Sequence, residues 1–111
     1  MITLVELCTE ALEFAGIPRD SVRVELFDSE RLDGHTRWGI APVSNPVVRI
    51  ARRLEERPAR GVITALHEAA HILSGDQGHT HLFDEQWRRL SSREFLVALD
   101  ARLADKFGAA A

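Results

Sequence analysis

Residues 58–74 read PARGVITALHEAAHILS, and Gly75 follows them directly. The apolar residues of this stretch recur at intervals of three and four, the spacing of one helix face: Val62, Ile63, Leu66, Ala69, Ala70 and Leu73. Pro58 suits the first turn of a helix, where its missing N–H is not needed, and Gly75 suits the position after the last turn. The sequence therefore predicts a helix over residues 58–74, around which the rest of the chain must pack.

The N-terminal segment predicts another helix. Thr3 can cap it, and Gly16 followed by Pro18 supplies a stop signal. Cys8 lies on its apolar side, so we expect a buried, unreactive thiol. Because Cys8 is the single cysteine, a disulfide within the chain and a cysteine-rich zinc module are excluded, and a metal site would have to use histidines and carboxylates.

Strands are expected between these two helices. Residues 21–27 alternate apolar and polar side chains with the period of two that a half-buried strand shows. After a polar turn over residues 28–34, residues 36–43 and 47–51 are the next candidate strands. We expect them to form a small, mostly antiparallel sheet.

Two more helices are predicted after residue 75. The first contains Phe83, Trp87 and Leu90, and Ser91 with Glu94 resembles a capping box for the second. The buried stripe of that last helix would be Phe95, Leu96, Leu99, Leu103 and Phe107. Helices at both ends of a small sheet give an α+β fold, and 111 residues suffice for a single domain over residues 1–111.

The composition is that of an ordinary globular protein, with 45% apolar and 28% charged residues. No stretch approaches the roughly 20 apolar residues of a membrane span, and the N-terminus does not read as a signal peptide. We therefore expect a cytoplasmic protein without a membrane partner. The net charge of −3 argues against nucleic acid as the main ligand.

Five arginines nevertheless cluster in one segment: Arg49, Arg52, Arg53, Arg57 and Arg60. Glu55 and Glu56 lie among them. A solvated face of mixed charge is the preferred interpretation, with a phosphate-binding patch as the alternative.

The predicted central helix carries a pattern with chemical meaning. His67 and His71 are four residues apart, so both imidazoles project from one face of the helix, about one turn apart, with Glu68 beside them. Two neutral imidazoles suit zinc, which in catalytic sites keeps a position open for water. The glutamate can accept the proton of that water and deliver it to a leaving nitrogen. The pattern predicts a zinc-dependent hydrolase with Glu68 as general base.

Zinc needs a third protein ligand, and residues 75–81, GDQGHTH, offer several. The glycines allow a short loop to fold back over the end of the helix. His79 is the preferred third ligand and His81 the next, while Asp76, Glu85 and Glu94 stay open as alternatives.

A hydrolase of this kind also needs a donor to the oxyanion. The chain has no tyrosine. The histidine among His79 and His81 that does not bind the metal is the natural candidate, which assigns a catalytic role to His81 when His79 is the ligand. His35 and Arg37 are the next candidates.

With these residues the chain resembles the zincin metallopeptidases, and more narrowly the minimal SprT-like group and small metallohydrolases of bacteria and phages. The resemblance covers roughly residues 47–87 and rests on a strand, a helix with His67-Glu68-x-x-His71, and Gly78-His79-x-x-x-Phe83. It implies a zincin-like minidomain in which His67, His71 and His79 bind zinc and Glu68 is the general base. Met1 is the only methionine, so the Met-turn of metzincins is absent.

The expected function is therefore that of a zinc metallopeptidase acting on a polypeptide substrate. Such a small domain would bind an extended chain along an edge strand of its sheet. The alternatives are a zinc-stabilised binding or regulatory module without turnover and a metal-free structural use of the helix.

Overall fold

The central helix is confirmed with the bounds that the sequence predicts. In a computed structural model, which describes residues 2–37, 45–75 and 78–108, helix α2 covers Pro58–Ser74. Gly75 ends it in the left-handed conformation, with φ at +68°, and its N–H donates to the carbonyls of His71 and Ile72. Glycine adopts this conformation without steric cost, which explains the stop.

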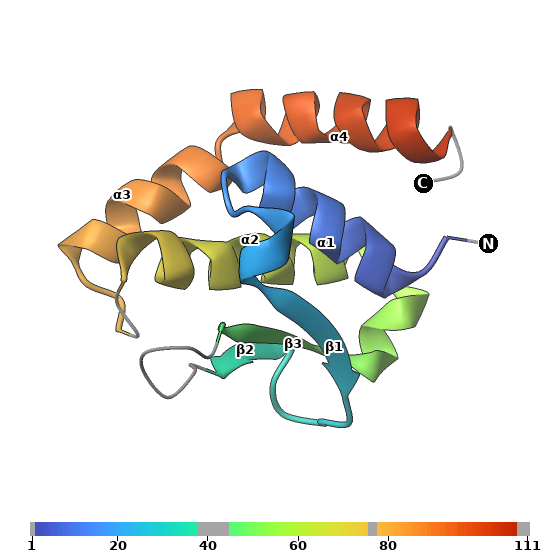
Figure 1. The fold of residues 1–111 in the computed structure, drawn as a ribbon, viewed down its shortest axis with the longest axis horizontal. Coiled ribbons are helices and arrows are strands. Elements are labelled where there is room, and N and C mark those ends of the chain that lie inside the picture. The colour runs from blue at the N-terminus through green and yellow to red at the C-terminus, as the bar shows by residue number, and fades with distance from the viewer. Residues whose placement is uncertain (1, 38–44, 76–77, 109–111) are drawn as a thin grey trace.

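The other elements arrange themselves around α2 in layers. In Figure 1 the sheet lies at the bottom, α1 and α2 lie side by side above it, α3 crosses one end, and α4 covers the top. The described elements are α1 (Leu4–Ala15), η1 (Arg19–Ser21), β1 (Arg23–Phe27), β2 (Gly34–Arg37), β3 (Val47–Ala51), η2 (Arg52–Glu56), α2, α3 (His81–Leu90) and α4 (Arg93–Phe107). The predicted α+β fold is confirmed.

Helix α1 has the predicted boundaries and packs closely on α2. The Thr3 hydroxyl accepts a hydrogen bond from the Glu6 N–H at 3.1 Å, and Gly16 ends the helix at φ +112°. At Gly61 of α2 a Cβ atom would lie 2.6 Å from a methyl group of Leu4, so any larger residue would force the Leu4 side chain to move. Cys8 is fully buried beside it, and burial raises the pKa of its thiol to about 12.

The sheet is mixed, because β3 inserts between the two strands that precede it. Its strand order is β1-β3-β2, with β1 parallel and β2 antiparallel to β3. The sheet was expected to be mostly antiparallel, and one of its two described pairings is parallel instead. Strand β1 is shorter than predicted because Arg19–Ser21 turn as a 3-10 helix.

Strand β2 begins two residues earlier than predicted, at Gly34. A Cβ atom on Gly34 would lie 2.6 Å from Thr64 Cγ2 and 2.8 Å from the carbonyl oxygen of Arg49. The missing side chain therefore lets β2 lie close to both α2 and β3. Residues 38–43 of the predicted strand lie outside the described residues.

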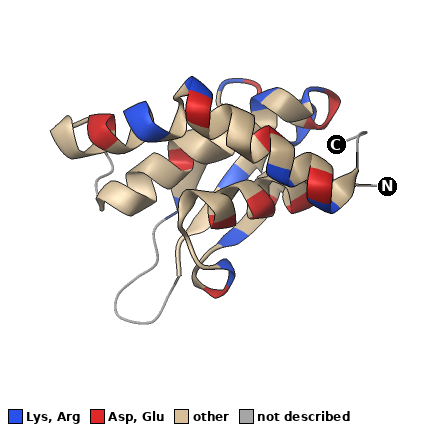
Figure 2. Ribbon diagram, turned by 90° about the horizontal axis from the view of Figure 1, so that it is seen from above, with Lys and Arg blue, Asp and Glu red and all other residues tan. Residues whose placement is uncertain are grey.

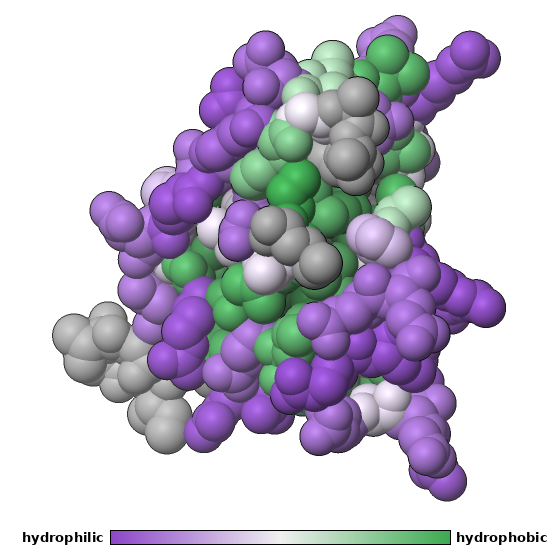
Figure 3. All heavy atoms as spheres, turned by 90° about the vertical axis from the view of Figure 1, so that its right-hand side faces the viewer, coloured by the Kyte–Doolittle hydropathy of each residue, from purple (hydrophilic) through white to green (hydrophobic). Residues whose placement is uncertain are grey.

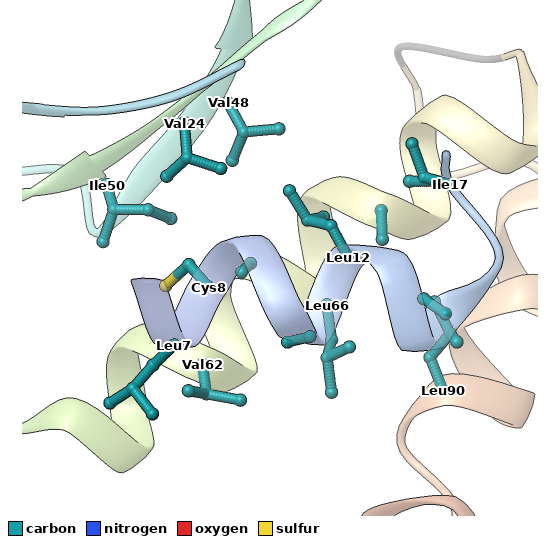
Figure 4. Close-up of a cluster of buried hydrophobic side chains, with 14 of the residues drawn as sticks. Leu7, Cys8, Leu12, Ile17, Val24, Val48, Ile50, Val62, Leu66 and Leu90 are labelled. Carbon is teal, nitrogen blue, oxygen red and sulfur yellow. The ribbon is translucent and has the colours of Figure 1, made fainter. Parts of the chain in front are cut away.

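The core fills the space between one face of the sheet and the two central helices. Figure 4 shows Val24, Val48 and Ile50 of the sheet directed towards Cys8 and Leu12 of α1, with Leu66 on the other side of α1 in this view. Since alternate strand residues point to opposite faces, this side of the sheet is apolar. The predicted burial of Leu99 and Leu103 in α4 is confirmed, while Phe95, Leu96 and Phe107 are partly buried against the core.

Helix α4 starts one residue later than the capping pattern suggested. The Ser92 hydroxyl caps α4 by accepting a hydrogen bond from the Phe95 N–H at 3.2 Å. Ser91 instead ends α3, and its hydroxyl donates to the Trp87 carbonyl. The helix is also bound to α1 through Glu10, whose side chain is only 1% exposed and accepts hydrogen bonds from Arg19, Arg102 and Lys106 at 2.7–2.9 Å.

Charged groups on the surface are largely interleaved, as Figure 2 shows for the helices. Four members of the arginine cluster pair with carboxylates: Arg49 with Glu25, Arg52 with Asp28, and Arg53 and Arg60 with Asp33. This is the mixed-charge face that was preferred. Seen from the end where both termini lie, apolar side chains gather at the centre and hydrophilic ones surround them (Figure 3). Among the described residues, no helix has the length and apolar character needed to cross a membrane.

Candidate metal centre

Three histidines converge where α2 ends and α3 begins. His67 and His71 come from α2, His79 from the segment between the helices, and ligand-capable atoms of all three lie within 4.8 Å of one another. The ring centroids are 5.1–5.3 Å apart. The two histidines of α2 share a face because they are four residues apart, and the left-handed Gly75 turns the chain back towards them.

The donor set suits a metal ion. In catalytic zinc sites three protein ligands, which can all be imidazoles, leave the fourth coordination position open for water or substrate. Imidazole also binds copper, iron and nickel. Zinc holds its ligand nitrogens at about 2.0–2.1 Å, so the imidazoles must approach more closely than 4.8 Å around it. His79 is the exposed member of the group, so its side chain is the one with the most room to shift towards the other two. The three residues can therefore hold a metal ion.

Phe83 of α3 supports all three imidazoles. Its ring centroid lies 4.4 Å from that of His71, 4.6 Å from that of His79 and 5.1 Å from that of His67. One turn further along α3, Trp87 packs at 5.2 Å from His67. Phe83 is 3% exposed. An aromatic floor therefore restricts the orientations that the imidazoles can adopt, which pre-organises the site.

Glu68 lies beside this group and is buried. Its Oε1 accepts a hydrogen bond from the Thr36 hydroxyl at 2.7 Å, and its Oε2 lies 3.3 Å from His67 Nδ1. Burial raises the pKa of Glu68, but the hydrogen bonds from His67 and Thr36 and the nearby imidazole of His71 outweigh it, so the pKa lies below its ordinary value. At neutral pH the side chain is a carboxylate held at a fixed place.

The other residues considered as ligands lie elsewhere. His81 is on the first turn of α3, 81% exposed, with its Nε2 3.3 Å from Glu85 Oε1, and neither belongs to the three-histidine group. Glu94 is exposed on the first turn of α4. Asp76 lies outside the described residues.

His35 and Arg37 were the further candidates for a donor to the oxyanion. Strand alternation places both on the face of β2 opposite to Thr36, which contacts Glu68 on α2. The ring of His35 packs edge-on against Phe27 at 4.9 Å, and Arg37 is exposed.

Thr36 and Trp87 are the site residues that sequence reasoning missed. Thr36 is 32 positions from Glu68, and only the register of β2 reveals their contact. Trp87 was named only as part of the helix predicted after residue 75. Its position four residues after Phe83 was a usable signal, because residues four apart on a helix share a face.

The described chain thus combines a small α+β fold with three histidines that could hold a metal ion. Two solved structures share this fold. One is the crystal structure of the metallopeptidase zymogen jannalysin of Methanocaldococcus jannaschii, with a TM-score of 0.64 and 15% sequence identity over 96% of this chain and 98% of that chain. The other is the metallopeptidase zymogen abylysin of Pyrococcus abyssi, with a TM-score of 0.58 and 17% identity over 94% of each chain. No family model and no curated protein matches the chain.

Proposed function

We propose that this chain is a zinc-dependent peptidase of the zincin type, in which His67, His71 and His79 bind zinc and Glu68 is the general base. The observation that carries the proposal is the position of the buried Glu68 carboxylate beside three converging imidazoles. The metallopeptidase fold of both structural neighbours supports the same reading. The SprT-like resemblance and a cytoplasmic location remain predictions.

The two oxygens of Glu68 have different tasks in this proposal. When bound, zinc supplies Lewis-acid chemistry that polarises a carbonyl and makes water a nucleophile near neutral pH. Thr36 donates to Oε1 at 2.7 Å, whereas Oε2 has only the longer contact with His67 Nδ1 at 3.3 Å. Oε2 is therefore assigned as the oxygen that takes the proton of the attacking water. The same oxygen then delivers the proton to the leaving nitrogen.

An extended polypeptide fits the free edge of β2. This strand pairs only with β3 among the described residues and contacts α2, which carries Glu68. A peptide that added to this edge would bring its backbone past the candidate site. His81 is kept as donor to the oxyanion. Its exposed side chain reaches the site only by leaving Glu85.

The test combines metal content with turnover of the full chain. We expect the purified protein to bind one equivalent of zinc and to cleave an unfolded protein such as reduced casein. Glu68→Gln keeps the metal but lowers cleavage by about 100-fold or more, the usual contribution of a general base. Glu94→Gln, an exposed control on α4, changes neither quantity. Cleavage that persists in Glu68→Gln, or a wild-type chain without tightly bound zinc, contradicts the proposal.

A further inference from the structure

A cleft of about 400 Å³ lies next to His67 and Glu68. Residues 31–34, which end with the first residue of β2, form one wall, and the face of α2 from Arg60 to Glu68 forms the other. Trp87 of α3 closes part of it. Both His67 and Glu68 line the cleft. If a peptide bond of the substrate is cleaved at these residues, the cleft can therefore hold a substrate side chain next to that bond.

The cleft offers apolar contact from both walls. Leu32 on the loop is 52% exposed and Ile63 on α2 is 38% exposed, although both are large hydrophobic side chains. Trp87 adds a partly buried ring. Exposed apolar groups that line the same cleft favour a ligand with a methylene stem.

The charges of the cleft are divided between its two ends. At the loop end, Asp33 is already shared, because Oδ1 accepts from Arg53 at 2.8 Å and Oδ2 accepts from Arg60 Nε at 2.7 Å. Within the described residues, the Nη groups of Arg60 donate no hydrogen bond, and the guanidinium of Arg31 makes neither a hydrogen bond nor an ion pair. The loop end therefore carries an excess of positive charge, while the carboxylate of Glu68 occupies the opposite end, engaged by Thr36.

We propose that this cleft selects substrates with an acidic side chain, glutamate above all, next to the cleaved bond, and that Arg31 is the specificity-determining residue. The inference rests on the proposed peptidase function. The methylenes of a glutamate side chain would lie between Leu32 and Ile63, and its carboxylate would reach Arg31 and Arg60. A lysine in the same place would meet two guanidinium groups and be repelled.

The wall that carries Arg31 is fixed before any ligand arrives. The Ser29 hydroxyl accepts hydrogen bonds from the N–H groups of Arg31 and Leu32 at 3.3 and 2.9 Å. Arg53 donates to the carbonyls of Ser29 and Leu32, both at 3.0 Å. A preformed wall allows a charge preference to appear even in short, weakly bound peptides.

The test measures binding, so that it is independent of turnover. The probes are three capped pentapeptides, Ala-Ala-X-Ala-Ala, with X as Glu, Gln or Lys, added to the ¹⁵N-labelled full-length Glu68→Gln variant. The indole N–H resonance of Trp87, identified with Trp87→Phe, reports occupancy of the cleft. We expect the Glu peptide to bind about fivefold to tenfold more tightly than the Gln peptide, and the Lys peptide to bind least.

Arg31→Gln should remove this preference, whereas Arg93→Gln should leave it. Arg93 is the matched control, because it is exposed on α4, has no ion pair among the described residues and does not line the cleft. Equal affinities for the Glu and Gln peptides, a preference that survives Arg31→Gln, or no saturable shift with the Glu peptide up to about 10 mM overturns the inference.

The two proposals can fail separately. Selective binding of the Glu peptide together with absent cleavage by the wild-type chain refutes the peptidase function and leaves an acidic-peptide site. Cleavage of casein at bonds without neighbouring acidic residues, read by mass spectrometry, refutes the specificity and leaves the peptidase function intact.

Discussion

Replacing Phe83 by leucine should weaken metal binding more than its effect on folding alone would suggest. Phe83 is 3% exposed and lies within 4.4–5.1 Å, centroid to centroid, of all three imidazoles. Leucine keeps much of the apolar volume but removes three ring contacts, each worth about 0.5–1.5 kcal/mol beyond buried area. We expect the free energy of unfolding of the metal-free protein to fall by about 1.5–4.5 kcal/mol, the sum of these three contacts.

The effect on the metal follows from the freedom that the imidazoles gain. Loss of a group that orients metal ligands typically costs 10-fold to 100-fold in affinity, or about 1.4–2.7 kcal/mol. Competition with a chromophoric chelator measures the zinc affinity, and urea denaturation of the metal-free protein measures stability. Leu90→Ala is the matched control, because Leu90 is fully buried on the same helix and has no place in the three-histidine group.

The control should lose about 2–5 kcal/mol of stability while its zinc affinity changes by less than about threefold. The reasoning is refuted if Phe83→Leu binds zinc as tightly as the parent protein. It is equally refuted if Leu90→Ala weakens zinc binding to the same extent, because the loss would then reflect general loosening of α3.

Three other predictions concern the surroundings of the site and the core. Thr36→Val removes the hydrogen bond to Glu68 Oε1 and should lower kcat about tenfold with little change in KM or zinc content. Thr36→Ser keeps a hydroxyl and should retain most of the parent's kcat. An unchanged kcat in Thr36→Val excludes a positioning role for Thr36. Gly34→Ala places a Cβ atom 2.6 Å from Thr64 Cγ2 and should lower the free energy of unfolding, measured by urea denaturation, by about 1–3 kcal/mol. A variant as stable as the parent would show that β2 can move away from α2 at little cost. Burial raises the pKa of Glu10, but the hydrogen bonds from Lys106 and Arg102 outweigh this effect, so the pKa lies below its ordinary value. Ionised Glu10 therefore stabilises the fold fully above its ordinary pKa, and this stabilisation is lost as the pH falls through the depressed value. Glu10→Gln should therefore lose about 2 kcal/mol at pH 7, and its stability curve below about pH 4.5 should be flatter than that of the parent, which parallel curves would contradict.

The parts of the fold that depend on short-range signals could be predicted from the sequence. Pro58 and Gly75 fixed both ends of α2, and the four-residue spacing of His67 and His71 placed their imidazoles on one face. These features depend on neighbours within one or two helical turns, where geometry allows few alternatives. The start of β2 was misplaced, because Gly34 belongs to the strand through its pairing with Ile50 of β3, which lies far along the chain.

Longer-range features could not be predicted in this way. The insertion of β3 between β1 and β2 is a pairing of segments far apart in the sequence, and alternation within a strand does not reveal it. The contact of Thr36 with Glu68 depends on that register. The proximity of His79 to the two helical histidines is now a geometric observation, whereas its role as ligand and the catalytic role of His81 stay predictions.

The side chain of Arg53 gives the loop before β2 a property that matters for binding. Its contacts with Ser29, Leu32 and Asp33 join residues at least 20 positions apart. Fixing the backbone of a residue costs about 1–2 kcal/mol in conformational entropy. For these loop residues the ordering takes place when the chain folds. A ligand that entered the cleft would meet a surface already in place, so its weak contacts would count almost fully towards affinity. Removing the hydrogen bonds of Arg53 would therefore weaken binding, although Arg53 itself does not line the cleft.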